Sequence, residues 1–430
     1  MSHVLQRLLL VSGVVVAFAA RAAAQERDTT DLKRLEAQID AITQELEELR
    51  LGRELVVEAD TSIYGFGPAA SKVYKVGQGV SIGGYGEVLY ENFANSRQDD
   101  TPSAATDRLD ALRAIVYVGY KFSDRILFNS EIEFEHGSTE DGGSVSIEFA
   151  YLEYRLSRAL GLRAGLLLPP MGFINEVHEP PAFLGARRPE TERQIIPSTW
   201  RESGIGVFGS FGDLSYRAYL VNGFDAAGFT ASGIRGGRQN GAEARAQNFG
   251  AVGRLDYSGV NGLALGTSAY LGNSGQGAVL ASDPTRSIGA RTFIWEGHAQ
   301  YKQRGFDLTG LLAVSTLDQA AAINELVGLT GPASVGERLI GWYLQGGYDI
   351  LRGSRSRHQL VPYLRYEQLN TQDKVPAGFS SDPANDSGLV TAGAMWKPLP
   401  NVSLKADYQI TSNEAQTGVN QLNVNLGYLF

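Results

Sequence analysis

Apolar and polar residues alternate along the chain from Val80 to its last residue, so that every second side chain shares a face. Residues 402–411 show this most clearly: the apolar positions are Val402, Leu404, Ala406, Tyr408 and Ile410, and the polar ones are Ser403, Lys405, Asp407, Gln409 and Thr411. A period of two is that of a β-strand, because successive side chains point to opposite faces of the sheet. Residues 80–430 are therefore predicted to form an all-β region.

The alternation and the turn signals between alternating runs predict about sixteen strands. Their expected bounds are 80–93, 108–121, 125–136, 143–156, 160–168, 203–211, 213–223, 247–258, 261–272, 288–303, 305–316, 337–351, 356–370, 385–397, 400–412 and 418–430. Many are longer than the five or six residues usual in soluble proteins, and short links follow the even-numbered strands while longer loops follow the odd-numbered ones. A soluble β-sandwich would alternate in the same way, but whole rows of charge on the polar faces suit a water-filled lumen better. The predicted fold is an antiparallel outer-membrane β-barrel of about sixteen strands over residues 80–430, preceded by a helical coiled coil.

The first 24 residues have the order of a cleavable secretion signal. Arg7 supplies the positive charge, residues 8–20 are apolar, and Ala22-Ala23-Ala24 provides the small residues of a cleavage site. The alternative is a membrane anchor helix, which needs about twenty apolar residues. We therefore expect an exported protein of the bacterial outer membrane. An even number of strands would place both ends of the barrel chain in the periplasm.

The hydrophobic period changes to 3.5 in the segment 27–50. Apolar residues recur there at spacings of three and four, at Leu32, Leu35, Ile39, Ile42, Leu46 and Leu49. So narrow a stripe favours a periplasmic coiled coil, and isoleucine at both kinds of core position favours three strands and hence a homotrimer. The alternative is an amphipathic helix packed on a globular body. Residues 51–79 are expected to be a linker to the barrel.

The composition narrows the possible chemistry. The 430 residues include no Cys, which excludes disulfides, thiolate metal sites and cysteine nucleophiles, and the net charge of −9 disfavours nucleic acid as a partner. Glu176, His178 and Glu179 lie among prolines rather than on one helix face, so no metal site is predicted. A barrel enzyme would need a serine or carboxylate beside a histidine. We expect neither enzymatic activity nor a cofactor.

Several segments resemble the phosphate-selective porin O and P family. They are GGYGEVLYE (83–91), FNSEIEFEH (128–136), IEFAYLEYRL (147–156), LRAGLLLPPMGFINEVHEPPAF (162–183), RPETERQIIPSTWRESGIGVFG (188–209) and YLVNGFD (219–225). The likeness covers most of 80–430 and is strongest before residue 225. It implies a sixteen-stranded trimer through which small hydrophilic solutes, including anions such as phosphate or small carboxylates, diffuse passively. The final strand with Tyr428 and Phe430 also resembles the tail that the barrel-assembly machinery recognises.

In general porins the third long loop folds inward and narrows the channel, which implies that role for residues 169–202 here. The loop contains six prolines that would stiffen it. The resemblance assigns four arginines to the pore lining: Arg187, Arg188, Arg193 and Arg201. Arginines at a constriction would attract anions. The alternative is that they pair with the loop's own glutamates (Glu176, Glu179, Glu190, Glu192 and Glu202) and only hold the loop against the wall.

Acidic residues also occupy the expected lumen side of one strand, at Glu131, Glu133 and Glu135. We expect them to line a wet lumen or to bind cations. The expected partners are outer-membrane lipid, the barrel-assembly machinery, small hydrophilic solutes and further copies of the chain. The alternative function is a structural barrel with a blocked lumen, whose coiled coil tethers the outer membrane to a periplasmic partner.

Overall fold

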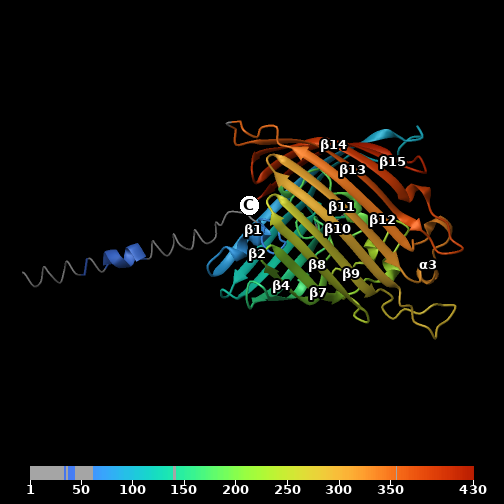
Figure 1. Cartoon of the computed structure of the whole chain (residues 1–430), viewed down its shortest axis with the longest axis horizontal. Helices are drawn as coiled ribbons and strands as arrows, with labels where there is room; N and C mark the ends of the chain where they lie inside the picture. The colour runs from blue at the N-terminus through green and yellow to red at the C-terminus, as the bar shows by residue number, and fades with distance from the viewer. Residues whose placement is uncertain (1–32, 35–36, 44–61, 139–141, 355) are drawn as a thin grey trace, which may run out of the picture. The chain divides into compact units, whose positions relative to one another are not determined.

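The computed structural model describes residues 33–34, 37–43, 62–138, 142–354 and 356–430. Within these residues sixteen strands form one closed antiparallel barrel, in which sequence neighbours pair and β1 closes the ring with β16 (Figure 1). The strands are β1 (Gly79–Arg97), β2 (Arg108–Lys121), β3 (Ile126–Glu135), β4 (Ser144–Arg155), β5 (Gly161–Leu167), β6 (Glu202–Phe211), β7 (Leu214–Asn222), β8 (Phe249–Val260), β9 (Leu263–Asn273), β10 (Arg291–Gln303), β11 (Phe306–Leu317), β12 (Arg338–Tyr348), β13 (Gln359–Lys374), β14 (Asp386–Leu399), β15 (Val402–Asn413) and β16 (Val419–Leu429). Each predicted strand overlaps one of these, so the predicted antiparallel barrel is confirmed.

The apolar faces of the strands point outward and the polar faces point into the lumen. On β15, Lys405 is 1% exposed and Asp407 3%, whereas their neighbour Tyr408 is 46% exposed. β16 repeats this pattern, with Asn423 and Asn425 buried. A soluble sandwich would bury the opposite face, so this inversion rules out that alternative and matches a barrel surrounded by lipid.

Exposed aromatic side chains gather near both ends of the barrel. One group lies where the strands meet the short turns. It consists of Tyr120, Phe122, Tyr154, Phe211, Tyr257, Phe306, Tyr348, Trp396 and Tyr428. Near the opposite end Phe134, Phe249 and Phe293 are exposed. Girdles of aromatic residues at both levels are typical of barrels whose ends lie in the two lipid–water interfaces.

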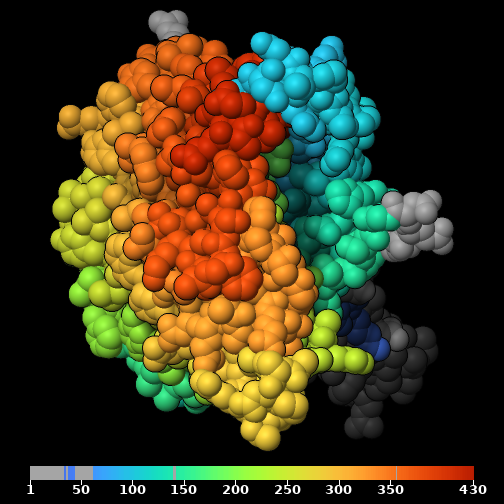
Figure 2. Space-filling model, turned by 90° about the vertical axis from the view of Figure 1, so that its right-hand side faces the viewer, coloured from blue at the N-terminus to red at the C-terminus, as the bar shows by residue number. Residues whose placement is uncertain are grey.

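Most short connections lie at one end of the barrel and most long ones at the other. Tight links such as Arg304–Gly305 lie at the end where the chain enters β1, which we call the short-turn end. At the opposite, long-loop end the β1–β2 loop (cyan) and the β9–β10 loop (yellow) project from the rim (Figure 2). Among the described residues, no helix is long and apolar enough to cross a membrane. The connections carry short helices, namely η2 (Pro180–Ala182), α2 (Glu190–Gln194), η3 (Ala226–Gly228), η4 (Arg235–Gly237), α3 (Ala320–Val327), η5 (Gly331–Ala333) and η6 (Pro383–Asn385).

The last residue of the chain takes part in closing the ring. The backbone N–H of Phe430 donates to the carbonyl of Gly84 at 2.9 Å, and the N–H of Gly84 donates back at 3.0 Å. A Cβ at Gly84 would lie 2.3 Å from the carbonyl oxygen of Ile115 and 2.7 Å from the ring of Phe430. Only glycine therefore fits where β1, β2 and the C-terminus meet.

The chain divides into two compact units between Val56 and Val57. In the first, residues 33–34 and 37–43 are helical, and Ile39 and Ile42 are each 56% exposed. The expected secretion signal (1–24) and four of the expected coil positions (Leu32, Leu35, Leu46 and Leu49) lie outside the described residues. The coiled coil therefore stays a prediction.

Part of the expected linker packs inside the barrel. Residues 51–61 lie outside the described residues, but residues 62–78, which include η1 (Ala70–Tyr74), contact β1, β2 and β3. Five apolar side chains of this stretch are at most 3% exposed: Phe66, Ala69, Ala70, Val73 and Val76. Burying them away from water is the physical reason that this stretch is not a free linker. We call residues 62–78 the lumen segment.

Candidate pore constriction

The connection between β5 and β6, residues 168–201, crosses the lumen. We call it the constriction loop. Its Glu176 accepts a hydrogen bond from Arg217 on β7 at 2.7 Å, and the N–H of its Ala186 donates to Asp407 on β15 at 2.6 Å. The same loop therefore contacts strands on widely separated parts of the wall. The inward position predicted for residues 169–202 agrees with these contacts.

Glu192 of α2 anchors the constriction loop. Its carboxylate accepts hydrogen bonds from the N–H groups of Phe173 and Ile174 at 2.9 and 2.8 Å, and from the hydroxyl of Tyr343 on β12 at 2.7 Å. The side chain is fully buried. Burial raises the pKa of Glu192, although its hydrogen bonds favour the charged form.

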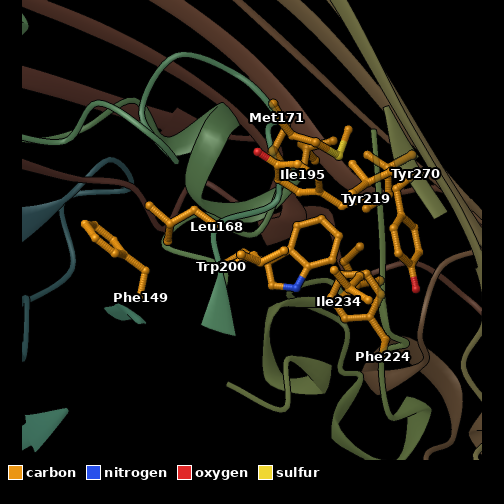
Figure 3. Packing of buried hydrophobic residues seen from close by; sticks show 14 of the residues in the cluster. Phe149, Leu168, Met171, Ile195, Trp200, Tyr219, Phe224, Ile234 and Tyr270 are labelled. Atoms are coloured by element: carbon orange, nitrogen blue, oxygen red, sulfur yellow. The ribbon is translucent and has the colours of Figure 1, made fainter. Parts of the chain in front are cut away.

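A hydrophobic cluster lies where the constriction loop meets the long connection between β7 and β8 (Figure 3). Trp200 is fully buried, stacks on Phe224 at 4.6 Å between ring centroids and meets the ring of Tyr270 edge-on at 5.1 Å. Ile234 belongs to the same cluster. Aromatic packing of this kind fixes the end of the constriction loop to its neighbour.

The four predicted pore-lining arginines differ in their surroundings. Arg187 pairs with Glu91 of β1 at 3.1 Å and with Glu190 at 3.3 Å, and Arg201 pairs with Glu148 of β4. Arg193 pairs with Glu190 at 2.7 Å but leaves 44% of its side chain exposed. Nη2 of Arg188 is buried with no hydrogen-bond partner in the described part of the chain.

These contacts bear on the two readings of the loop arginines. Arg187 and Arg193 pair with Glu190 of the loop itself, as the alternative supposed. Arg187 and Arg201 also pair with Glu91 of β1 and Glu148 of β4, which brace the loop against the wall. Arg193 and Arg188 retain positive charge that is exposed or incompletely bonded. Nε of Arg201 is likewise buried without a hydrogen-bond partner among the described residues.

Two further arginines, Arg235 and Arg238, approach the constriction loop from the β7–β8 connection. Within the described residues their hydrogen bonds go to main-chain carbonyls, including those of Arg193 and Thr199. Burial and the positive charges of Arg238 and Arg193 lower the pKa of Arg235 to about 9, and burial lowers that of Arg238 to about 10. Both stay charged at neutral pH, in a group of cations that an anion would stabilise.

The acidic residues predicted to line the lumen do lie on the inner face of β3. Glu131 is fully buried and faces Nε2 of His178 at 3.0 Å. Glu133 is 4% exposed and lies 3.8 Å from Arg113, and Glu135 accepts from Ser144 at 3.1 Å. Burial, together with the charges of Arg188 and Arg113, lowers the pKa of His178 to about 3, so its imidazole is neutral. Glu131 and Glu133 face protein rather than open water, which differs from the expected wet wall, whereas Glu135 is partly exposed.

Three lysines reach the other side of the constriction loop from β10, β14 and β15. Lys302, Lys397 and Lys405 donate to the carbonyls of residues 182, 181 and 185 at 3.4, 2.5 and 2.9 Å. Nζ of Lys405 also lies 3.9 Å above the ring of Phe183. The three ammonium groups thus gather around residues 181–185, with Asp307 pairing only Lys302 among the described residues.

Open space remains on the short-turn side of the constriction loop. A cavity of about 380 Å³ lies against β7–β12, with Arg217, Arg254, Lys302 and Asp256 among its lining residues. A second cavity of about 430 Å³ is bounded by residues 181–183, Lys302 and Lys397. Both lie along the lysine-bearing half of the wall.

Sequence reasoning did not single out Arg235, Arg238 or the three lysines. The alternation of polar and apolar residues places Lys405 on a polar face. This pattern predicts that the side chain faces the lumen, but not that it contacts the constriction loop. Arg235 and Arg238 are spaced by three within a Gly-rich loop, and nothing in that pattern indicates its position.

Comparison with solved structures identifies several barrels of the same fold. The outer membrane channel DcaP of Acinetobacter baumannii is 12% identical with a TM-score of 0.53, over 82% of this chain and 97% of that chain. Salmonella typhi OmpF, solved in complex with daunomycin, is 16% identical with a TM-score of 0.52, over 82% and 98%. An anion-selective porin from Comamonas acidovorans is 12% identical with a TM-score of 0.51, over 82% and 99%. At these identities the likeness concerns the fold.

Sequence comparison gives a nearer relative. No family model matches the chain. An uncharacterized protein of Aquifex aeolicus (strain VF5) is 39% identical over 371 residues, which cover 84% of this chain and 82% of that protein. Identity at this level over most of both chains establishes common descent, and the chain belongs to the same family as the Aquifex aeolicus protein.

Proposed function

We propose that the chain is an outer-membrane porin through which small hydrophilic solutes diffuse passively. The inverted alternation supports this most directly, because a closed ring with an apolar outside and a charged inside suits a pore in lipid. The similar barrels include an outer membrane channel and an anion-selective porin. The short-turn end then faces the periplasm and the long-loop end the outside.

The proposed pore prefers anions such as phosphate or small carboxylates. Positive groups without a paired carboxylate in the described residues lie on both sides of the constriction loop: Arg188, Arg235 and Arg238 on one side, and Lys397 and Lys405 on the other. Fixed cations in a narrow passage lower the energy of an entering anion and raise that of a cation. The resemblance to the phosphate-selective porin O and P family also supports this proposed anion preference.

The proposed assembly is a homotrimer. Ile39 and Ile42 are exposed on a helix, as the core positions of a coiled coil would be in a single copy. The similar structures include one described as a trimer form. Tyr428 and Phe430 are exposed at the end of the last strand, where the barrel-assembly machinery would bind them.

Planar-bilayer recording of the purified full chain tests this function. A trimeric pore should close in three equal current steps, and in a KCl gradient its reversal potential should have the sign of chloride preference. A reversal potential with the sign of potassium preference would refute the anion assignment. Complete absence of current would refute the porin itself.

One observation favours a second candidate, a structural barrel with a blocked lumen. The cluster around Trp200 and the lumen segment both fill space inside the ring with apolar side chains. In that case the barrel would carry the N-terminal helix as a tether and pass no ions. The bilayer recording separates the two, because the tether predicts zero conductance at every applied voltage.

A further inference from the structure

We propose that the lumen segment, residues 62–78, is a second constriction that closes the β1–β5 side of the short-turn end and directs solutes to an exit along β7–β14. The inference rests on the proposed function, because an exit exists only if solutes pass. It concerns a different part of the chain from the constriction loop. Three observations support it: the contacts that hold the segment against β2–β5, its contacts with the constriction loop, and the position of the open space.

Arg163 of β5 binds the lumen segment to the barrel wall. This arginine is 2% exposed, and its guanidinium lies 4.8 Å from the ring centroid of Phe66. It donates to the hydroxyl of Tyr74 at 3.3 Å, and both Arg163 and Tyr74 bond the same carboxylate oxygen of Glu153, at 2.9 and 2.8 Å. A buried ion pair that takes two partners from one segment holds that segment in a defined position.

Two more strands bind the main chain of the lumen segment. Lys121 at the end of β2 donates to the carbonyl of Val76 at 2.8 Å, and Asn129 of β3 donates to that of Ala70 at 3.0 Å. Together with Arg163 these contacts span the wall from β2 to β5. The segment therefore occupies this half of the short-turn end rather than hanging below it.

The constriction loop and the lumen segment also hold each other. Oε1 of Glu179 accepts the N–H groups of Ala69 and Ala70 at 2.9 and 3.1 Å, at the start of η1. Gly65 has a φ of +91°, and a Cβ there would lie 1.8 Å from Nη1 of Arg217. That guanidinium is itself fixed by Glu176 of the loop at 2.7 Å, so it cannot easily yield.

The remaining space lies on the opposite half. Ser62 and Gly65, at the start of the lumen segment, line one side of the 380 Å³ cavity, whose other side is formed by β7–β12. The 430 Å³ cavity continues along β10–β14 past Lys302 and Lys397. A solute that passes the constriction loop would leave beside these lysines, with the lumen segment as the facing wall.

Replacement of Gly65 tests the inference in the full chain. Gly65→Ala adds a methyl group that collides with Arg217 in a backbone conformation unfavourable for alanine, so the segment should leave its seat. The single-channel conductance should then rise above that of the wild-type protein. Gly79→Ala is the matched control, because Gly79 also has positive φ (+109°) but a Cβ there meets nothing within 4 Å.

A second variant covers the case in which Gly65→Ala does not fold. The chain has no cysteine, so Ser62→Cys can be modified by a cationic methanethiosulfonate reagent in the bilayer chamber. Modification should reduce the current and shift the reversal potential toward anions, whereas Thr285→Cys in the exposed β9–β10 loop should leave the current unchanged. If the wild type conducts but neither Gly65→Ala nor modified Ser62→Cys changes the current, the second constriction is refuted and the porin stands. If no protein conducts, the porin fails and the exit with it.

Discussion

Removal of the Glu192 carboxylate should release the constriction loop from the wall. In Glu192→Ala the N–H groups of Phe173 and Ile174 and the hydroxyl of Tyr343 lose their acceptor inside the barrel. Each buried donor left unsatisfied costs about 1–3 kcal/mol, so three of them cost about 3–9 kcal/mol. Loss of a buried carboxylate returns part of its desolvation cost, which the raised pKa of Glu192 reflects. We therefore expect Glu192→Ala to weaken docking of the constriction loop by about 3–5 kcal/mol.

Trypsin can report release of the loop, because the loop contains four arginines between residues 187 and 201. The strands do not contain Glu192, so the variant should keep its barrel while its loop is cleaved much faster than in the wild type. Tyr343→Phe is a graded comparison, since it removes one of the three bonds and leaves the two backbone donors with their acceptor. We expect cleavage between that of wild type and Glu192→Ala. A Glu192→Ala protein as resistant as the wild type, with unchanged conductance, would refute the reasoning.

Three further outcomes are expected. Joint replacement of Arg235 and Arg238 by glutamine should move the reversal potential in a tenfold KCl gradient toward potassium, by on the order of 10 mV out of the ~59 mV of an ideally selective pore. Val73→Cys with Gly119→Cys should form a disulfide on oxidation, because a Cβ at Gly119 lies 2.8 Å from that of Val73, about 1 Å short of the usual separation. Burial raises the pKa of Glu179 to about 8 against two backbone hydrogen bonds, with the charge of Glu131 adding to the rise. The folded state thus favours the protonated carboxyl of Glu179. The resulting stabilisation of the folded state is complete below about pH 4.5 and is lost as the pH rises through about 8. Tryptic cleavage within residues 62–78 should therefore accelerate between pH 6 and 9.

Each of these outcomes has a control. Arg245 lies on the same connection as Arg235, but its side chain is 58% exposed and paired with Asp225. Arg245→Gln should therefore leave the reversal potential unchanged. The Val73→Cys single variant should show no intramolecular cross-link. Glu179→Gln keeps an acceptor for the two N–H groups without a titrating proton, so its cleavage should lose the pH dependence. A pH dependence that persists in Glu179→Gln would assign it to another group.

The barrel wall could be predicted from the sequence because each strand carries its own signal. On β15 the alternation of Lys405 and Asp407 with apolar residues gives both the strand and its two faces, and the structure buries the polar one. Glu131 and Glu133 were placed on the lumen side for the same reason. A period of two is a local property and needs no knowledge of the partner strand.

The interior could not be predicted in the same way, because its contacts join residues distant in sequence. Arg187 pairs with Glu91 across the lumen, and no spacing along the chain indicates that partner. The lumen segment did carry a local signal: four of its buried apolar residues are spaced i, i+3, i+4 and i+7 over 66–73, as on one face of a helix. That signal identifies an apolar face but not the surface that covers it.

The pairing of Phe430 with Gly84 has a consequence for how the ring closes. Until β1 and β16 pair, the sheet keeps two free edges whose unpaired amides can recruit other chains. A stop codon one position early would delete both hydrogen bonds to Gly84 together with the ring that packs on it. The remaining pairs of β1 with β16, from Tyr85–Leu429 to Arg97–Val419, would still close the ring, so loss of Phe430 would open the seam only at its short-turn end.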